Sequence, residues 1–364
     1  MDDPPNLVKT DFSKMDLFIK LKSDKSCDPF AGDDETADED FPFEKHGDAS
    51  RRNRGRLASY AAALAGTQFR VHTFCVIMYA GNVRFIRWDR SGAIVTERFN
   101  CAKRPYFLAQ FFWRFSHLNP EHKGHDTSVS PVPKAFPPQI LDTLRERISP
   151  TEPSKTSKNS SRKQTPVPPP TPPPVNPKEF RIFKVPDRKN PEEEKDFVVW
   201  LRELSDEYTA RSPFGRGTRL MLAYDVEKNV IFFLKDYWRA EGVDKEGDIY
   251  ELLESHRVPN IPPFGKGNDV RKHATFTDVL KAEGAEWALP SKEMTSYKHY
   301  RMTLDVVARP LTSFKSSREF VGAIADAMED ETSFGDFTLV TNSWLSQHMI
   351  VPTSMLESFI VTSA

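Results

Sequence analysis

The chain has 364 residues, of which 38% are hydrophobic, 28% are charged and 29 are proline. At roughly 150 residues per domain this length indicates two domains, and the composition excludes a collagen, a coiled coil and a wholly disordered protein. The formal net charge of −1 gives no overall electrostatic case for a nucleic-acid or anionic-membrane partner.

The cysteines and the lengths of the apolar runs indicate the cellular compartment of the protein. There are 3 cysteines and no Cys-x-x-Cys pair, which argues against a disulfide scaffold and a cysteine-based zinc site. No stretch approaches 18 consecutive apolar residues, and the acidic residues 1–5 lack the apolar core of a secretory signal. We therefore expect no membrane partner and a location in the cytoplasm or the nucleus.

Residues 1–54 are predicted to be a mostly disordered leader. Six of the eight residues at 33–40 are acidic, and a basic run follows at Arg51, Arg52, Arg54 and Arg56. Such opposed charge runs are typical of a solvated loop. A nuclear-import or nucleic-acid patch at the four arginines is the alternative interpretation.

Residues 55–130 are predicted to form a first α+β domain. Short turns at Gly81 and at Gly92 indicate antiparallel hairpins. Phe107, Phe111 and Phe115 recur at helical spacing, which is more typical of a core stripe than of a ligand platform. The predicted elements are a helix at 57–64, strands at 70–79, 83–89 and 93–99, and a helix at 105–117.

Residues 131–178 are predicted to be a linker rich in serine, lysine and proline. Prolines dominate residues 166–177, and they favour an extended, semi-rigid spacer between two domains. The tract also contains two Pro-x-x-Pro spacings, Pro166 to Pro169 and Pro170 to Pro173, of the kind that SH3 or WW domains bind. Protein partners that dock on this tract are the alternative to a simple spacer.

Residues 179–328 are predicted to form a second α+β domain, and residues 329–364 a divergent, mobile tail. An apolar face formed by Phe197, Val198, Leu201 and Leu204 indicates a helix. The predicted elements are helices at 193–208, 246–255 and 316–329 and strands at 219–226, 230–235 and 299–307. The predicted fold is two small α+β domains joined by a Pro-rich linker.

Three features of the second domain have the chemistry of a phosphate site. Gly215 and Gly217 form a turn whose N–H groups can approach a phosphate, and Lys235 at the end of a strand can neutralise one. Glu246 opens the next helix and can hold the lysine in place. This is the logic of a protein kinase N-lobe. Taken singly, such a glycine pair usually forms an ordinary turn, and a lysine at the end of a strand is usually solvated.

The chain resembles the fungal-type protein kinase family in several stretches. They are residues 87–98, 124–126, 215–219, 233–238, 246–250, 258–259, 300–311 and 314–319. The resemblance implies a kinase N-lobe in which Lys235 contacts the ATP phosphates and Glu246 is its partner. It also implies that Gly215 and Gly217 belong to the phosphate loop, although Leu220 stands where a third glycine is usual. Val307, with its two neighbours, falls at the hinge that binds adenine. Full-length relatives are implied to phosphorylate protein Ser or Thr with Mg-ATP.

The sequence departs from that family after residue 328. No HRD-type catalytic loop and no DFG motif occurs in the chain, and residues 334–337 read Phe-Gly-Asp-Phe. Without these motifs there is no base and no magnesium ligand. We therefore expect no catalytic residue, no kinase activity of this polypeptide, and magnesium binding only if a C-lobe is supplied. A truncated or degenerate kinase is one interpretation, and a non-catalytic scaffold that uses the first domain and the proline tract is the other.

Two other patterns are weaker. His117, His122 and His125 cluster in the sequence, but their spacing suits a loop more than a zinc site. Residues 16–22 faintly resemble a nuclease core, but Lys20 occupies the acidic position, which favours an ordinary strand. No metal ligand is assigned from either pattern.

Overall fold

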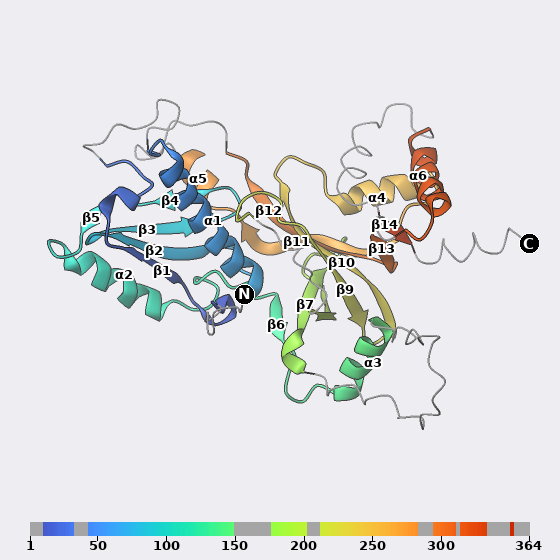
Figure 1. Ribbon diagram of the computed structural model, residues 1–364. Helices are drawn as coiled ribbons and strands as arrows, with labels where there is room; N and C mark the ends of the chain where they lie inside the picture. Colours follow the sequence, from blue (N-terminus) through green and yellow to red (C-terminus); the bar gives the residue numbers. More distant parts are fainter. Residues whose placement is uncertain are drawn as a thin grey trace, which may run out of the picture.

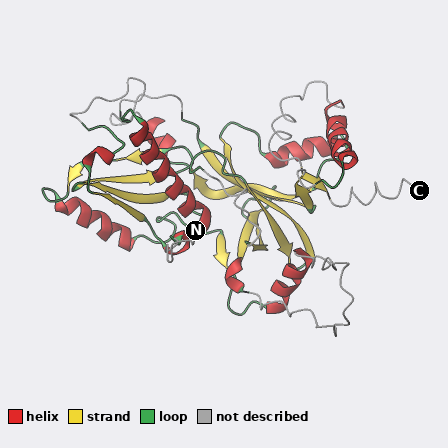
Figure 2. Ribbon diagram, viewed as in Figure 1, coloured by secondary structure: helices red, strands yellow, loops and turns green. Residues whose placement is uncertain are grey.

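Figure 1 shows the computed structural model, which describes residues 10–32, 43–148, 176–201, 212–282, 294–310, 314–332 and 350–352. Helices and largely antiparallel sheets are mixed along the chain (Figure 2), so the predicted α+β class is confirmed. The acidic run at 33–40, the proline tract up to residue 175 and most of the predicted tail lie outside the described residues. Of the helices within these ranges, none is long and apolar enough to cross a membrane.

The first sheet has five strands in the order β1-β2-β3-β4, and β5 also pairs with β3. β1 runs parallel to β2, and the other pairs are antiparallel. The elements are η1 (Phe12–Lys14), β1 (Phe18–Lys22), η2 (Lys25–Cys27), α1 (Asp48–Gln68), β2 (Thr73–Tyr79), β3 (Asn82–Trp88), β4 (Ala93–Val95), β5 (Phe99–Asn100) and α2 (Pro105–His117).

Two helices cover opposite faces of this sheet (Figure 1). Neighbouring residues of a strand point to opposite faces. Accordingly, Ile77 of β2 packs with Leu64 of α1, and Val76 packs with Phe111 of α2. The predicted hairpins, the helix at 105–117 and the core role of its phenylalanine stripe are therefore confirmed.

Part of the predicted leader is folded. Phe18 of β1 and Phe30 are buried in the core beneath α1, which makes this segment an integral part of the first sheet. The basic run lies in the first turns of α1, and its Arg54 Nε is 2.8 Å from the Glu44 carboxylate. The expectation of disorder rested on the charge runs at 33–40 and 51–56, whereas residues 10–32 carry apolar side chains that this core takes up.

The second sheet has seven antiparallel strands in the order β11-β12-β10-β9-β8-β7-β6. Its elements are β6 (Val129–Pro131), α3 (Pro138–Ile148), η3 (Pro177–Glu179), β7 (Phe180–Pro186), β8 (Glu194–Trp200), β9 (Arg219–Asp225), β10 (Val230–Ala240), α4 (Glu246–Ser255), β11 (Phe264–Ala274), α5 (Thr277–Ala282) and β12 (Tyr297–Leu304). After it come β13 (Ala308–Pro310), which pairs with β14 (Ile350–Pro352), and α6 (Ser317–Thr332).

Two helices pack on this sheet. Tyr250 of α4 lies among Tyr237 and Tyr300, and Leu144 of α3 packs against Phe180 and its neighbours. α3 and the last residue of β6 fall within residues 131–178, which were expected to be linker. The structure differs there because α3 has an apolar stripe that the sheet buries.

The predicted helix at 193–208 is wrong over residues 194–200, which form strand β8. Four consecutive apolar residues, Phe197 to Trp200, are all buried, alternately against the cores on the two faces of the sheet. A short apolar run buried on both sides has no periodicity that separates a strand from a helix, and its β-branched and aromatic residues favour the strand.

Candidate functional site

Lys235 and Glu246 form a buried ion pair. Lys235 Nζ is 2.7 Å from one carboxylate oxygen of Glu246 and 2.8 Å from the other. Both residues are less than 10% exposed. An ammonium group has three N–H donors, and Glu246 takes two of them. Among the described residues no further acceptor lies within hydrogen-bond distance of Nζ, so one donor remains for a ligand.

The local fold explains this contact. Residues two apart on a strand share a face, so Lys235 and Tyr237 of β10 both face α4, whose first residue is Glu246. Lys235 Nζ lies 5.1 Å from the centre of the Tyr237 ring. Burial, and next the Glu246 charge, raise the pKa of the Tyr237 hydroxyl well above its usual range. The phenol therefore stays neutral beside the pair.

The glycine turn comes directly before β9, one of the two strands that pair with β10. Gly215 and Gly217 have φ values of +75° and +51°, which side chains rarely adopt. The Arg216 carbonyl accepts a 2.8 Å bond from the Trp238 N–H of β10. The Gly215 N–H donates to the Arg90 carbonyl at 2.9 Å, and a Cβ on Gly217 would overlap the Arg90 guanidinium. These two glycines thus contact the first sheet, which their sequence did not indicate.

Val307 lies just after β12, on the opposite neighbour of β10. The carbonyl of Val306 accepts the Phe233 N–H at 3.1 Å, and Phe233 is two residues before Lys235. The Val307 side chain is 37% exposed. The glycine turn and the predicted hinge therefore flank the same strand that carries Lys235.

The face of the second sheet away from α4 carries a buried charge network that the sequence did not reveal. Arg301 of β12 donates from Nε to Asp236 of β10 at 2.9 Å, and from Nη2 to Asp126 at 2.9 Å. Asp126 precedes β6 and is also bonded to Ser128. Burial alone would raise the pKa of the Asp236 carboxyl, but His299 and Arg301 hold it far below its usual range. The only sequence signal was that Asp126 and Arg301 both lie in stretches of family resemblance.

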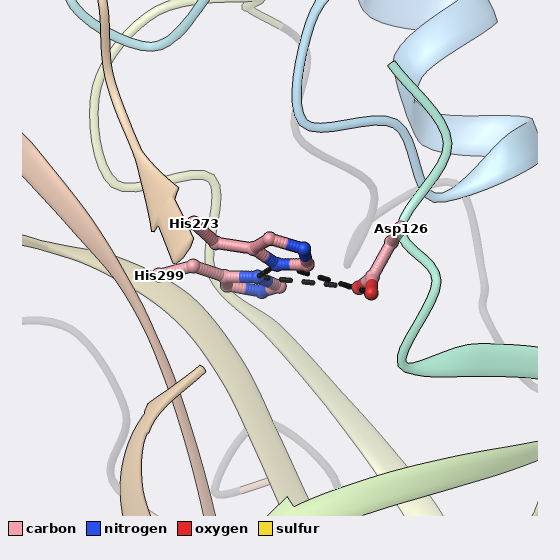
Figure 3. A group of neighbouring side chains, drawn as sticks. All are labelled: Asp126, His273 and His299. Carbon is pink, nitrogen blue, oxygen red and sulfur yellow. Dashed lines mark hydrogen bonds and ion pairs between the residues drawn. The ribbon is translucent and has the colours of Figure 1, made fainter. Parts of the chain in front are cut away.

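Two histidines complete this network (Figure 3). His273 Nδ1 and His299 Nδ1 are 3.0 Å apart, and His299 Nε2 is 2.8 Å from Asp236 Oδ1. Burial lowers the pKa of His273 to about 4, although the Asp126 charge opposes this shift. A neutral His273 that donates to His299, which in turn donates to Asp236, satisfies every nitrogen that faces the cluster.

The same side chains could in principle hold a metal ion. One ligand atom from each of Asp126, His273 and His299 lies within 4.8 Å of the others. However, Asp126 is already neutralised by Arg301, whose fixed positive charge would repel a cation. The arrangement therefore acts chemically as a hydrogen-bonded charge network, and we assign no metal to it.

The weaker sequence patterns do not form sites. His117 and His122 each bond to their own neighbours, Trp113 and Asn119, and His125 lies 3.9 Å from Asp16. The segment with Lys20 is the ordinary strand β1. Among the described residues these three histidines do not form a group of metal ligands.

Comparison with known proteins identifies the family. The family model described as fungal protein kinase matches residues 37–335, which is more than half of the chain. The chain therefore belongs to the fungal protein kinase family, and the membership expected from its motifs is confirmed. Searches of curated proteins and of solved structures found no match.

Proposed function

We propose that the second sheet with α4 is a nucleotide-binding lobe resembling a kinase N-lobe, and that Lys235 binds the phosphates of Mg-ATP. The observation that carries the proposal is the buried Lys235–Glu246 pair with one ammonium donor left over. Kinases use a strand lysine held by a helix glutamate for this purpose. A buried ion pair is weak support for stability as such, which favours a functional reason for it.

The flanking segments have matching roles in this proposal. Val307 and its neighbours present backbone groups to adenine, next to the strand that carries Lys235. Gly215 and Gly217 belong to the loop that covers the phosphates. The contacts of both segments with β10 support these roles.

We further propose that residues 1–364 bind nucleotide without transferring phosphate. Their sequence contains no HRD-type or DFG motif, and phosphoryl transfer requires a positioned base and metal ligands. Magnesium would then be held mainly by the nucleotide until a C-lobe is supplied. Autophosphorylation of the purified protein that is lost in Lys235→Met would contradict this.

The nucleotide proposal is tested by thermal unfolding with and without Mg-ATP. At 100-fold excess over Kd, a ligand that binds only the folded state stabilises it by about 2.7 kcal/mol. We expect this stabilisation in the wild type and in Lys228→Met, an exposed-lysine control, but not in Lys235→Met. Because Lys235→Met leaves Glu246 buried without its cation, Lys235→Met/Glu246→Gln is tested beside it. An equal response of all four proteins would overturn the assignment of Lys235.

Partner binding by the first domain and the proline tract is the second candidate function. It is favoured by a groove of about 240 Å³ along α2, which is lined mainly by phenylalanines such as Phe74, Phe107 and Phe111 and includes Arg114. No stabilisation of the wild type by Mg-ATP would favour this candidate. The three unpaired cysteines of the chain support a reducing compartment, the cytoplasm or the nucleus, for either function.

A further inference from the structure

The turn between β3 and β4, residues 89–92, reaches from the first sheet into the second. Asp89 is its centre: Oδ1 accepts the N–H of Ser91 at 3.0 Å and so closes the turn. Its other oxygen, Oδ2, accepts the N–H groups of Phe276 and Thr277 at 2.9 and 3.0 Å. One buried carboxylate therefore shapes the turn and also holds the start of α5.

The next residues strengthen the contact with the α5 side. The Ser91 hydroxyl donates to the Thr295 carbonyl at 2.6 Å and lies 2.9 Å from Asp278. A Cβ on Gly92 would lie 2.7 Å from the methyl group of Met294. The segments on both sides of residues 283–293 are thus attached to the same turn.

Arg90 points the other way, toward the glycine turn. Its carbonyl accepts the Gly215 N–H at 2.9 Å, and its Nη1 donates to the Ser212 carbonyl at 3.1 Å. Its guanidinium lies against the bare Cα of Gly217. Trp88 adds a ring contact with Phe214, at 5.7 Å between centres. All these contacts fall on residues 212–217.

The position of Arg90 is costly. The guanidinium is buried, and no carboxylate among the described residues lies within ion-pair distance. Burial, and next the repulsion from Arg219, lower the pKa of Arg90 to about 10. Burying a charge without a paired carboxylate is unfavourable. The contacts that offset this cost lie on the glycine turn, at the Ser212 carbonyl and at Gly217.

The glycine turn is in turn linked to the lysine. The Arg216 guanidinium lies 5.2 Å from the centre of the Tyr237 ring, and Lys235 Nζ lies 5.1 Å from the same centre. The space between Arg90, Gly217 and Arg219 is a cavity of about 10 Å³, room for about one water. Arg90 is therefore tightly packed against Gly217, and the residue before Gly217, Arg216, contacts the Tyr237 ring.

We propose that Arg90 is a positioning residue, through which the first sheet fixes the glycine turn at residues 212–217 relative to Lys235. The consequence for nucleotide affinity rests on the proposed function. The N-terminal sheet then regulates the nucleotide site without contacting the nucleotide, and a ligand that shifts the turn at 89–92 changes the affinity for ATP.

Amide hydrogen exchange of the nucleotide-free full chain tests the positioning directly. We expect Arg90→Ala to speed exchange at residues 212–217 and to leave residues 276–278 unchanged. Arg87→Ala is the matched control, because Arg87 stacks on Phe276 and bonds to Asp89 on the α5 side. It should speed exchange at 276–278 and leave 212–217 unchanged. Unchanged exchange at 212–217 in Arg90→Ala would overturn the proposal.

A double-mutant cycle isolates the contact with Gly217. Gly215 and Gly217 both have positive φ, but only Gly217 faces Arg90, since a Cβ on Gly215 would meet nothing within 4 Å. We expect Gly217→Ala to lower the unfolding midpoint more than Gly215→Ala, and Arg90→Ala to relieve part of the Gly217→Ala loss only. If the effects of Arg90→Ala and Gly217→Ala were strictly additive, as those of Arg90→Ala and Gly215→Ala should be, the contact would be contradicted.

Titration with a fluorescent ATP analogue separates the two proposals. If the wild type binds it, Arg90→Ala should weaken binding about fivefold or more, the lower range for coupled sites, and Arg90→Lys should not restore it. Unchanged affinity in Arg90→Ala would refute the effect on the nucleotide site. If the wild type does not bind it, the proposed function fails, and the exchange experiment still decides whether Arg90 holds the turn.

Discussion

At the scale of single residues, strand β10 brings buried charge to both faces of the second sheet. Lys235 faces Glu246 of α4, whereas Asp236, the next residue along β10, faces Arg301, which also bonds to Asp126. The alternation of a strand makes this possible, because adjacent residues serve different faces. A one-residue slip of β10 would exchange the two sets, so both faces specify its register.

One histidine of the network, His273, makes folding stability depend on pH. The unfolded His273 titrates near 6.5, and burial lowers its pKa to about 4 in the folded protein. The unfolded state therefore binds more protons below pH 6.5, and stability is lost as the pH falls from about 6.5 to about 4. We expect a loss of up to about 3 kcal/mol from this group.

Chemical denaturation across that pH range measures the effect. His273→Asn should reduce the acid slope, and His117→Asn, which changes an exposed histidine, should not. Burial also lowers the pKa of His72 to about 4, so this histidine contributes a part of the acid slope in every variant. The charged and titratable groups that face His273 are unchanged in this variant; they are Asp126, Asp236, His299 and Arg301. An unchanged slope in His273→Asn would show that folding does not lower the pKa of this histidine.

At the scale of elements, α3 packs firmly although its segment was predicted to be linker. Leu144 is fully buried between α3 and the second sheet. We expect Leu144→Ala to lower the free energy of unfolding by about 2–5 kcal/mol, since it leaves a cavity. Glu146→Ala, at an exposed position two residues further along the same helix, is the control and should stay within about 0.5 kcal/mol. Urea denaturation compares the two, and equal effects would mean that α3 is not part of the cooperative core.

Local pattern determined which elements the sequence could predict. α2 and α4 were predicted with their observed bounds, because each has a continuous amphipathic repeat. β8 was predicted as part of a helix, and β11 was not predicted. The sequence of β11 has no apolar face that alternates along the strand, because polar residues such as Asn268 and His273 interrupt it. Asn268 instead bonds to the carbonyls of Asp187 and Arg188 on a distant segment.

The contacts of the candidate site also differ in whether the sequence could predict them. Lys235 and Glu246 are eleven residues apart, so strand and helix periodicity could bring them together in prediction. Arg90 and Ser212 are separated by 122 residues, and Asp126 and Arg301 by 175. Contacts of that range depend on how two sheets meet, which no local pattern encodes.

At the scale of the whole molecule, the two sheets are joined by contacts from several separate segments. The turn at 89–92 holds the glycine turn and α5, and Asp126 holds Arg301. Arg219 lies over the ring of Phe69, which itself belongs to the core of the second sheet. The first sheet is therefore an integral support of the second.

The position of α3 has a consequence for a clipped chain. Residues 149–175 leave from α3 and return at η3, and both elements lie on the same sheet, where β6 also pairs with β7. Cutting the backbone within 149–175 should therefore yield two fragments that remain one particle, as in a split protein whose halves reassemble. We expect such a nicked protein to elute at the intact size in gel filtration and to separate only in denaturant. Separation under native conditions would mean that this stretch of chain tethers two independent bodies.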